Sequence, residues 1–215
     1  MAKLFQFVPF KVEDHFYSNE AFAKLCDDAV LAFNATPVCD FPPPMIKGAG
    51  VYAIYCTATK GIYEKFGNSV NRLEYRRPIY VGSAVPPGWR KSRTAGKNLK
   101  TNSLQSRLMT HSESIRQGSG LDIEDFACRF MIFDDNTVNM ITAVESALIA
   151  HYTPLWNTCI DGFGNHTPGA KRKDGKLTKW DTLHHGRGWT KKMSGEPSNI
   201  KEIKKSVMDY MMGLK

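Results

Sequence analysis

The order of strand-like and helix-like segments between residues 50 and 152 restricts the fold of this chain most strongly. Two short β-prone segments come first, over 50–56 and 77–84, and the first is entered through glycines. A helical pattern over 101–115, an alternating strand over 125–133 and a second helical pattern over 136–152 follow. This order predicts a small α/β (α+β) core, in which a three-stranded, mainly antiparallel sheet is flanked by helices.

The N-terminal part is expected to be a helical extension followed by a linker. Residues 18–34 have a helical pattern, with Ser18 or Asn19 as the cap. The proline-rich stretch 35–44 cannot continue that helix. The apolar face of the helix is predicted to consist of Phe22, Leu25, Cys26, Ala29 and Phe33.

The whole chain is predicted to form one domain with additions to a central core. A basic C-terminal extension is expected to contact DNA or a second subunit and to close with an amphipathic helix over 199–214. The predicted boundaries are 1–45 for the N-terminal extension, 46–160 for the core with insertions at 57–76 and 84–103, and 161–215 for the C-terminal extension.

The net charge of +8 is concentrated in two segments. Residues 76–116 hold nine Lys or Arg and one acidic residue, residues 166–215 hold twelve against five, and the remainder is net acidic. Tryptophans accompany both segments: Trp89 in the first, Trp180 and Trp189 in the second. Such segments are typical of proteins that bind a phosphate backbone. A solvated surface that keeps the protein in solution would give the same charge.

Cysteine usage and hydropathy favour a protein of the reducing cytoplasm. The five cysteines are odd in number and widely spaced, and no Cys-x-x-Cys pair occurs. This argues against a disulfide framework or a cysteine zinc site. No apolar run approaches the ~20 residues of a membrane span. The N-terminal residues also lack a secretory cleavage site after an apolar stretch.

Glu145 is the sharpest chemical signal in the sequence. The helix over 136–152 has an apolar stripe, and Glu145 falls inside it. Burying an isolated carboxylate costs several kcal/mol unless it is protonated or has a partner, so a cation, a metal or a catalytic role is expected. Two structural alternatives remain open: a salt bridge to an arginine such as Arg129, or a helix turned so that Glu145 reaches the rim.

His111 and Arg107 lie on one side of the preceding helix, one turn apart. A lone histidine in an apolar stripe is more often a hydrogen-bonded core residue than a catalyst. A guanidinium beside it favours an anion such as phosphate. Tyr52 and Tyr80 occupy the two β-prone segments, where simple core packing would also account for them.

Taken together and in this order, these residues resemble the GIY-YIG nuclease superfamily. Gly50-Val51-Tyr52 corresponds to the first motif and Tyr80-Val81-Gly82 to the second, with valine in place of the central isoleucine. The helix "LQSRLMTH" supplies Arg107 and His111, and the stretch "ITAVESALIAHYTPLWN" supplies Glu145 and Asn157. The resemblance covers residues 50–157. It is closest to small type II restriction endonucleases, one branch of which cuts the palindrome CCGCGG.

The resemblance implies Mg²⁺-dependent hydrolysis of DNA, with one metal per active site and Mn²⁺ as a possible substitute. Glu145 would bind the metal and Arg107 would compensate the developing charge. Tyr52 would activate water with help from His111, because a free tyrosine titrates near ~10 and is a poor base at neutral pH. Tyr80 would hold a phosphate oxygen or the tyrosine pair, and Asn157 would fix the backbone or the substrate.

The implied partners are double-stranded DNA, a second subunit and a cognate DNA methyltransferase in the same cell. A palindromic target favours a homodimer, because one active site cuts one strand. Base reading in the major groove needs donors such as Arg and Lys. The candidate DNA-binding residues are Arg90, Arg93, Lys97, Lys100, Lys171, Arg172 and Lys173.

Three other readings remain open. A non-catalytic DNA- or RNA-binding protein would account for the basic segments but would leave Glu145 unexplained. A repair or mobile-element nuclease of the same superfamily would usually carry further domains. The tail sequences "GNHTPG" and "HHGRGW" suggest a histidine-metal nuclease, although they lack paired ligands.

A second tripeptide competes for the first motif. Gly61-Ile62-Tyr63 has the literal family spelling and lies closer to Tyr80 in the chain. It is followed by many polar residues with little strand alternation. We therefore assign the chemistry to Tyr52 and interpret Tyr63 as part of an insertion that repeats the letters by chance.

Overall fold

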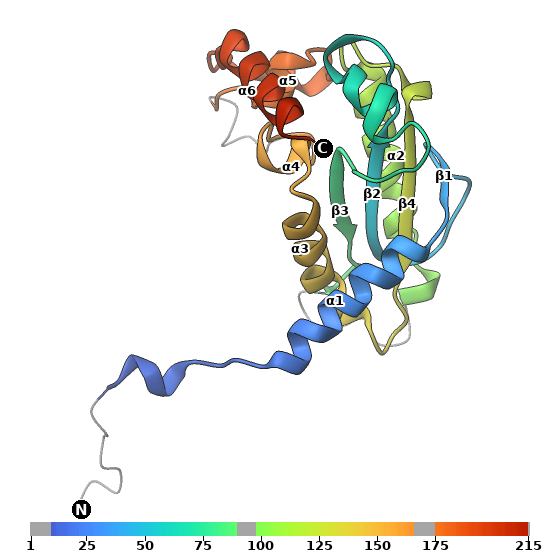
Figure 1. The fold of residues 1–215 in the computed structure, drawn as a ribbon, viewed down its shortest axis with the longest axis vertical. Coiled ribbons are helices and arrows are strands. Elements are labelled where there is room, and N and C mark those ends of the chain that lie inside the picture. The colour runs from blue at the N-terminus through green and yellow to red at the C-terminus, as the bar shows by residue number, and fades with distance from the viewer. Residues whose placement is uncertain (1–9, 90–97, 166–174, 215) are drawn as a thin grey trace, which may run out of the picture.

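A computed structural model describes residues 10–89, 98–165 and 175–214 and shows an antiparallel four-stranded sheet with helices on both faces (Figure 1). The strand order is β1-β4-β2-β3. In the middle, β2 (Gly50–Cys56) pairs with β4 (Phe126–Ile132) on one side and β3 (Tyr80–Ala84) on the other. The short β1 (Val38–Asp40) pairs with the outer side of β4. Within the described residues, β3 is thus an edge strand.

Helices make up most of the remaining regular structure. The α-helices are α1 (Glu20–Ala35), α2 (Ser103–Gln117), α3 (Ile141–Tyr152), α4 (Leu155–Thr158), α5 (Lys179–Leu183) and α6 (Ile200–Gly213). The short 3-10 and π segments are η1 (Val12–His15), η2 (Gly61–Tyr63), η3 (Phe66–Val70), η5 (Asn98–Lys100), η6 (Ile123–Asp125), η7 (Val138–Met140) and η9 (Gly188–Lys192).

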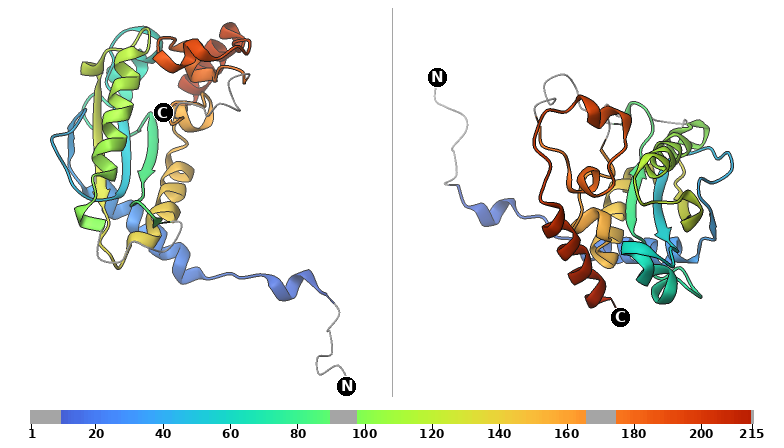
Figure 2. Two further views of the ribbon diagram at one scale, coloured as in Figure 1. Left: turned by 180° about the vertical axis from the view of Figure 1, so that it is seen from behind. Right: turned by 90° about the horizontal axis from the view of Figure 1, so that it is seen from above.

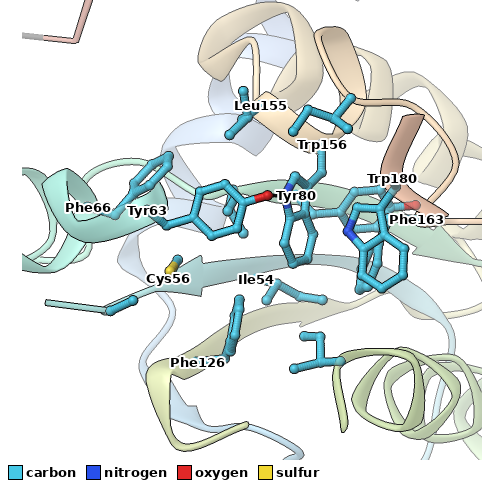
Figure 3. Close-up of a cluster of buried hydrophobic side chains, with 14 of the residues drawn as sticks. Ile54, Cys56, Tyr63, Phe66, Tyr80, Phe126, Leu155, Trp156, Phe163 and Trp180 are labelled. Carbon is cyan, nitrogen blue, oxygen red and sulfur yellow. Dashed lines mark hydrogen bonds between the residues drawn. The ribbon is translucent and has the colours of Figure 1, made fainter. Parts of the chain in front are cut away.

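Side-chain alternation along the strands divides the core into two clusters, one on each face of the sheet. Tyr52 and Tyr80 point to the face covered by α2. Val51 and Val81 point to the opposite face, which α1 and α3 cover. Residues far along the chain complete the first cluster, and the close-up in Figure 3 shows them beside Tyr80: Trp156, Phe163 and Trp180.

The predicted strands and helices of the core are confirmed, and one strand was missed. β2, β3 and β4 fall within the segments 50–56, 77–84 and 125–133. The fourth strand, β1, lies inside the stretch that was predicted to be a linker. It has three residues, held by pairing with β4 in the register Cys39↔Cys128. A segment this short contains too few residues to produce an alternating pattern.

The N-terminal helix is confirmed, but two of the five residues predicted for its apolar face are exposed. The Asn19 side chain accepts a hydrogen bond from the Phe22 amide, which makes Asn19 the cap. Phe33 is fully buried, whereas Phe22 is 51% exposed and Leu25 is 47% exposed. Figures 1 and 2 show the reason: the first turns of α1 extend beyond the sheet together with the segment before them.

The C-terminal residues contribute side chains to the same core cluster as the strands β2 and β3. α5 and α6 contact each other, and α6 also contacts η2. Trp180, one of the tryptophans in the basic C-terminal segment, is fully buried and therefore belongs to the core. The predicted insertion at 57–76 likewise contributes Tyr63, Phe66 and Val70 to the same core.

Candidate active site

Tyr52 and His111 form a buried pair in the middle of the α2 face. Tyr52 lies at the centre of β2, and its hydroxyl is 2.6 Å from Nε2 of His111 on α2. The Tyr52 side chain is fully buried and His111 is 1% exposed. Burial is the main cause that raises the pKa of Tyr52 well above its ordinary value, although the nearby Arg107 guanidinium opposes it. The phenol is therefore neutral at ordinary pH and can donate its proton to the imidazole.

Tyr80 and Arg107 lie next to this pair. The Tyr80 ring is 6.3 Å from the Tyr52 ring and 5.2 Å from the His111 ring, between centroids. Burial also raises the pKa of Tyr80, and the Arg107 charge lowers it in part. Both phenols act on Arg107 in return, and they raise its pKa although burial lowers it. The guanidinium therefore stays charged beside two neutral hydroxyls.

Glu145 approaches the same place from the other side of the edge strand. It lies on α3 and is half-buried, so it reaches the rim and is not enclosed in the apolar stripe. Ser83, the residue after the Tyr80-Val81-Gly82 motif, donates a hydrogen bond of 2.6 Å to its Oε2 atom. Its charge raises the pKa of both Tyr52 and Tyr80, after the larger effect of burial. The carboxylate is thus electrostatically coupled to the tyrosines.

The suggested salt bridge between Glu145 and Arg129 does not occur. Arg129 donates instead to the backbone carbonyl of Asn34 at 2.8 Å, and its guanidinium lies 5.7 Å from the centroid of the Tyr55 ring. Ser83 is therefore the neighbour that sequence reasoning missed. A serine after a glycine motif carries no pattern that would have identified it.

Asn157 anchors the second motif strand. Its Oδ1 accepts from the Val81 amide at 2.8 Å, and its Nδ2 donates to the Val81 carbonyl at 2.9 Å. Both bonds reach the central residue of Tyr80-Val81-Gly82. Of the two roles considered for Asn157, the geometry matches that of fixing the backbone.

Gly82 provides the space in which the tyrosine hydroxyl lies. An added Cβ at Gly82 would collide with the hydroxyl of Tyr52 and would lie 3.0 Å from the Tyr80 ring. A glycine is thus required here for close approach of side chains, because any larger residue would displace the Tyr52–His111 pair.

Two residues of the C-terminal part complete the site, and the sequence did not suggest them. The Phe163 ring stacks on the His111 imidazole, with centroids 4.5 Å apart and an interplanar angle of 18°. The Gly164 carbonyl accepts a hydrogen bond of 2.9 Å from Arg107 Nη2. An added Cβ at Gly164 would collide with the hydroxyl of Tyr80. In the sequence, these two residues stand in a glycine-rich stretch. Such a stretch is typical of any loop and does not indicate a role in the site.

Tyr63 lies in the core, with different partners. Gly61–Tyr63 forms a 3-10 helix and is not part of a strand. The Tyr63 hydroxyl lies 2.6 Å from His184 Nε2. It also accepts from Trp156 Nε1 at 3.0 Å, and Figure 3 shows the Tyr63 and Trp156 side chains next to each other. These bonds connect η2 to α4 and α5.

The histidines that suggested a metal site in the tail have other contacts where they are described. The Nδ1 atom of His184 lies 2.9 Å from the Ser119 carbonyl, and that of His185 lies 2.9 Å from the Ser119 hydroxyl. Across residues 10–89, 98–165 and 175–214, no group of three or more His, Cys, Asp or Glu could hold a metal ion. A metal bound by these residues would therefore need further ligands, such as water and substrate oxygens.

Most of the predicted DNA-binding residues lie outside the described residues. This applies to Arg90, Arg93, Lys97, Lys171, Arg172 and Lys173. Lys100 is described and exposed, at the end of η5 just before α2. No helix in the described part of the chain has the length and apolar character to cross a lipid bilayer.

Comparison with known proteins matches this geometry to a family. Residues 44–211 match the family model described as the Eco29kI GIY-YIG domain, and the match covers more than half of the chain and extends into α6. No curated protein matches the chain. The β2 tyrosine, the β3 tyrosine with its glycine, and the Arg107 and Glu145 helices all lie within the matched range. The chain therefore belongs to the Eco29kI GIY-YIG family of restriction endonucleases.

Proposed function

We propose that this protein is a type II restriction enzyme that cuts double-stranded DNA at a specific site in a Mg²⁺-dependent reaction. The observation that carries the proposal is the arrangement around Gly82. There, Tyr52 is paired with His111 in the core. The charges of Arg107 and Glu145 both act on Tyr52, and Tyr52 in turn acts on Arg107. Phosphodiester hydrolysis needs a proton acceptor, a cationic group for the developing charge and a metal ligand, and these residues can supply all three.

In the proposed reaction, the Tyr52–His111 pair takes the proton of the attacking water. The Tyr52 oxygen accepts the proton delivered from that water while the Tyr52 hydroxyl proton passes to Nε2 of His111, over 2.6 Å. Tyr52 never has to exist as a free tyrosinate, which its raised pKa would disfavour. The imidazole, with an ordinary pKa near ~6.5, is the better-matched final acceptor.

Tyr80 is proposed to form the outer end of this relay. Tyr52 has no exposed surface, whereas Tyr80 keeps 8% of its surface exposed. Burial is the largest influence on the pKa of Tyr80 and raises it, while the neighbouring Tyr52 phenol lowers it in part. A water held at the Tyr80 hydroxyl could therefore pass its proton inwards to Tyr52.

Arg107 is proposed to hold the scissile phosphate. Its guanidinium is half-buried and has one planar edge committed to the Gly164 carbonyl, so its orientation is fixed before DNA arrives. A fixed cation stabilises charge that grows on the phosphate oxygens without reorganising during the reaction. Asn157 supports this by holding Val81, and hence the tyrosine and glycine on either side of it.

The chain fits a magnesium ion at Glu145. Mg²⁺ keeps several waters and is commonly bound by one or two carboxylates together with substrate phosphates, so one half-exposed carboxylate suffices. Ser83 occupies Oε2 of Glu145 and so orients the carboxylate. When bound, the metal would polarise the phosphate and stabilise the leaving oxygen. Mn²⁺ is expected to substitute for it.

The target and the assembly are proposed from the family. A GC-rich palindrome such as CCGCGG would be read by a homodimer, with one active site for each strand. The basic residues at 90–100 and 171–173 are proposed to contact DNA. Residues 1–45 and 161–215 are proposed to be extensions of the nuclease core at 46–160, with 161–215 contacting DNA or the second subunit. A methyltransferase of the same specificity would protect the DNA of the cell.

Cleavage of bacterial genomic DNA, which contains every short palindrome, tests the function. The purified protein with Mg²⁺ is expected to give discrete fragments, whose sequenced ends define the site, and EDTA should abolish them. Glu145→Gln should abolish cleavage, while the control Glu124→Gln, at an exposed position on η6, should not. Random nicking would favour a repair enzyme, and DNA retention without cleavage would favour a binding protein.

A further inference from the structure

A buried arginine in the C-terminal part makes an unusually complete set of contacts. Arg187 is 2% exposed, and its Nε and Nη2 atoms donate to the two carboxylate oxygens of Asp181 at 2.6 and 2.7 Å. Asp181 is itself 1% exposed. The rings of Trp180 and Trp189 each lie 4.7 Å from the guanidinium carbon. A buried bidentate pair of this kind fixes direction as well as position.

The remaining donors of Arg187 hold one short stretch of backbone. Nη2 also donates to the Gly162 carbonyl at 2.9 Å, and Nη1 donates to the carbonyls of Phe163 and Asn165 at 3.1 and 3.4 Å. Three carbonyls of four consecutive residues thus converge on one guanidinium. This stretch, residues 162–165, has no helix or strand to define its shape within the described chain.

That same stretch supplies the two catalytic-site contacts from the tail. The Phe163 ring stacks on His111, and it also lies edge-on to Tyr80 with centroids 4.9 Å apart. The Gly164 carbonyl orients Arg107. An unbroken series of contacts therefore runs from Asp181 through Arg187 and residues 162–165 to the two α2 residues.

We propose that Arg187 is a positioning residue for the nuclease site: by holding residues 162–165, it fixes Phe163 against His111 and the Gly164 carbonyl against Arg107. Arg187 does not itself contact either α2 residue through any of these bonds, so it acts through the segment. The inference rests on the proposed roles of Arg107 and His111. It also means that the C-terminal part helps to build the catalytic centre, in addition to any contact with DNA.

The first test measures geometry in the free protein, without DNA. The ring protons of His111, assigned by comparison with His111→Gln, lie over the face of Phe163 and are shielded by it. In Arg187→Lys, which keeps the charge but loses the planar set of donors, these resonances should move downfield. The matched control is Arg129→Lys, at a half-buried arginine that, like Arg187, binds a backbone carbonyl and lies against an aromatic ring, but on the other face of the sheet. It should leave the His111 resonances unchanged.

The second test measures cleavage of genomic DNA with Mg²⁺ under single-turnover conditions. Arg187→Lys should slow cleavage about 100-fold, the scale of a misplacement near 1 Å, whereas Arg129→Lys should not. Should Arg187→Lys fail to fold, Gly164→Ala decides, because its added Cβ pushes on Tyr80 without touching the buried ion pair. It should produce a similar loss of rate with little change in melting temperature.

The outcomes separate the two proposals. Unchanged His111 resonances and unchanged cleavage in Arg187→Lys, or full activity in Gly164→Ala, would overturn the positioning role. If the wild-type protein does not cut DNA but the His111 resonances still respond to Arg187→Lys and not to Arg129→Lys, the structural coupling stands and the proposed function fails.

Discussion

Two buried tyrosines of this chain end in nearly the same hydrogen bond and have different surroundings. The hydroxyls of Tyr52 and Tyr63 each lie 2.6 Å from the Nε2 atom of a histidine. Only Tyr52 has a charged arginine and a carboxylate within electrostatic reach, while Tyr63 has Trp156 as a second partner. The two tyrosines can therefore be compared directly, because they share a hydrogen-bond type within one molecule and differ in their charged neighbours.

Tyr52→Phe should reduce DNA cleavage by about 10²- to 10⁴-fold, because it removes the hydroxyl through which the proton passes. Tyr63→Phe should retain cleavage and lower the free energy of unfolding by about 1–3 kcal/mol, because the buried Trp156 N–H loses its acceptor. Single-turnover cleavage and urea unfolding of both variants check this. Equal losses of activity would contradict the assignment of the chemistry to Tyr52.

Gly82→Ala should reduce cleavage about 100-fold, because the added methyl group occupies the position of the Tyr52 hydroxyl. The control is Gly188→Ala, since an added Cβ there meets nothing within 4 Å. Cleavage rates and the resonances of His111 are the measurements. A fully active Gly82→Ala enzyme would show that the close approach at this glycine is not needed.

At the scale of elements, sequence patterns located the long segments and failed for contacts between segments. The β-prone residues of β2, the alternation in β4 and the helical periods of α2 and α3 are set locally, so they could be predicted from the chain. β1 depends on pairing with β4, and the position of Glu145 depends on how α3 is rotated against β3. Such features are decided by tertiary packing, which periodicity does not encode.

Asn157→Asp should loosen the motif strand, because a carboxylate can accept from the Val81 amide but cannot donate to the Val81 carbonyl. Hydrogen exchange at the Val81 amide should speed up and cleavage should fall. Asn71→Asp is the control, since Asn71 donates to the carbonyls of Cys56 and Arg77 and should cost similar stability. Its Val81 exchange and its cleavage should stay near wild type, and a parallel loss in both variants would argue for general destabilisation.

At the scale of the whole molecule, the site is assembled from segments more than a hundred residues apart. Tyr52, Arg107 and Glu145 could be predicted because each lies in a recognisable strand or helix. Phe163, Gly164 and Arg187 could not, because their roles arise only when the C-terminal part folds back on the sheet. The family match from residue 44 to 211 covers both groups.

The packing of the C-terminal part into the core should be sensitive to acid, because His184 lies buried in it. Burial is the main cause that lowers the pKa of His184 from 6.5 to about 4. The unfolded chain therefore binds a proton between these values while the folded chain does not, so stability falls as the pH drops from about 7 to about 4. The expected loss from this residue is about 3 kcal/mol.

His184→Gln checks this, because a glutamine can donate to the Ser119 carbonyl and accept from Tyr63 without taking up a proton. Urea unfolding of wild type and variant at pH 7 and pH 4.5 should show a smaller loss in the variant. The same loss in both proteins would assign the acid sensitivity to other groups.

The two hydrogen bonds from Asn157 to Val81 have a consequence for how two copies can assemble. An edge strand with a free central amide and carbonyl can recruit a strand from another chain and continue the sheet. On β3 those two groups are already taken by a side chain from the same chain. A second chain therefore cannot extend the sheet through the Val81 groups of β3, and the proposed homodimer would have to form through another surface.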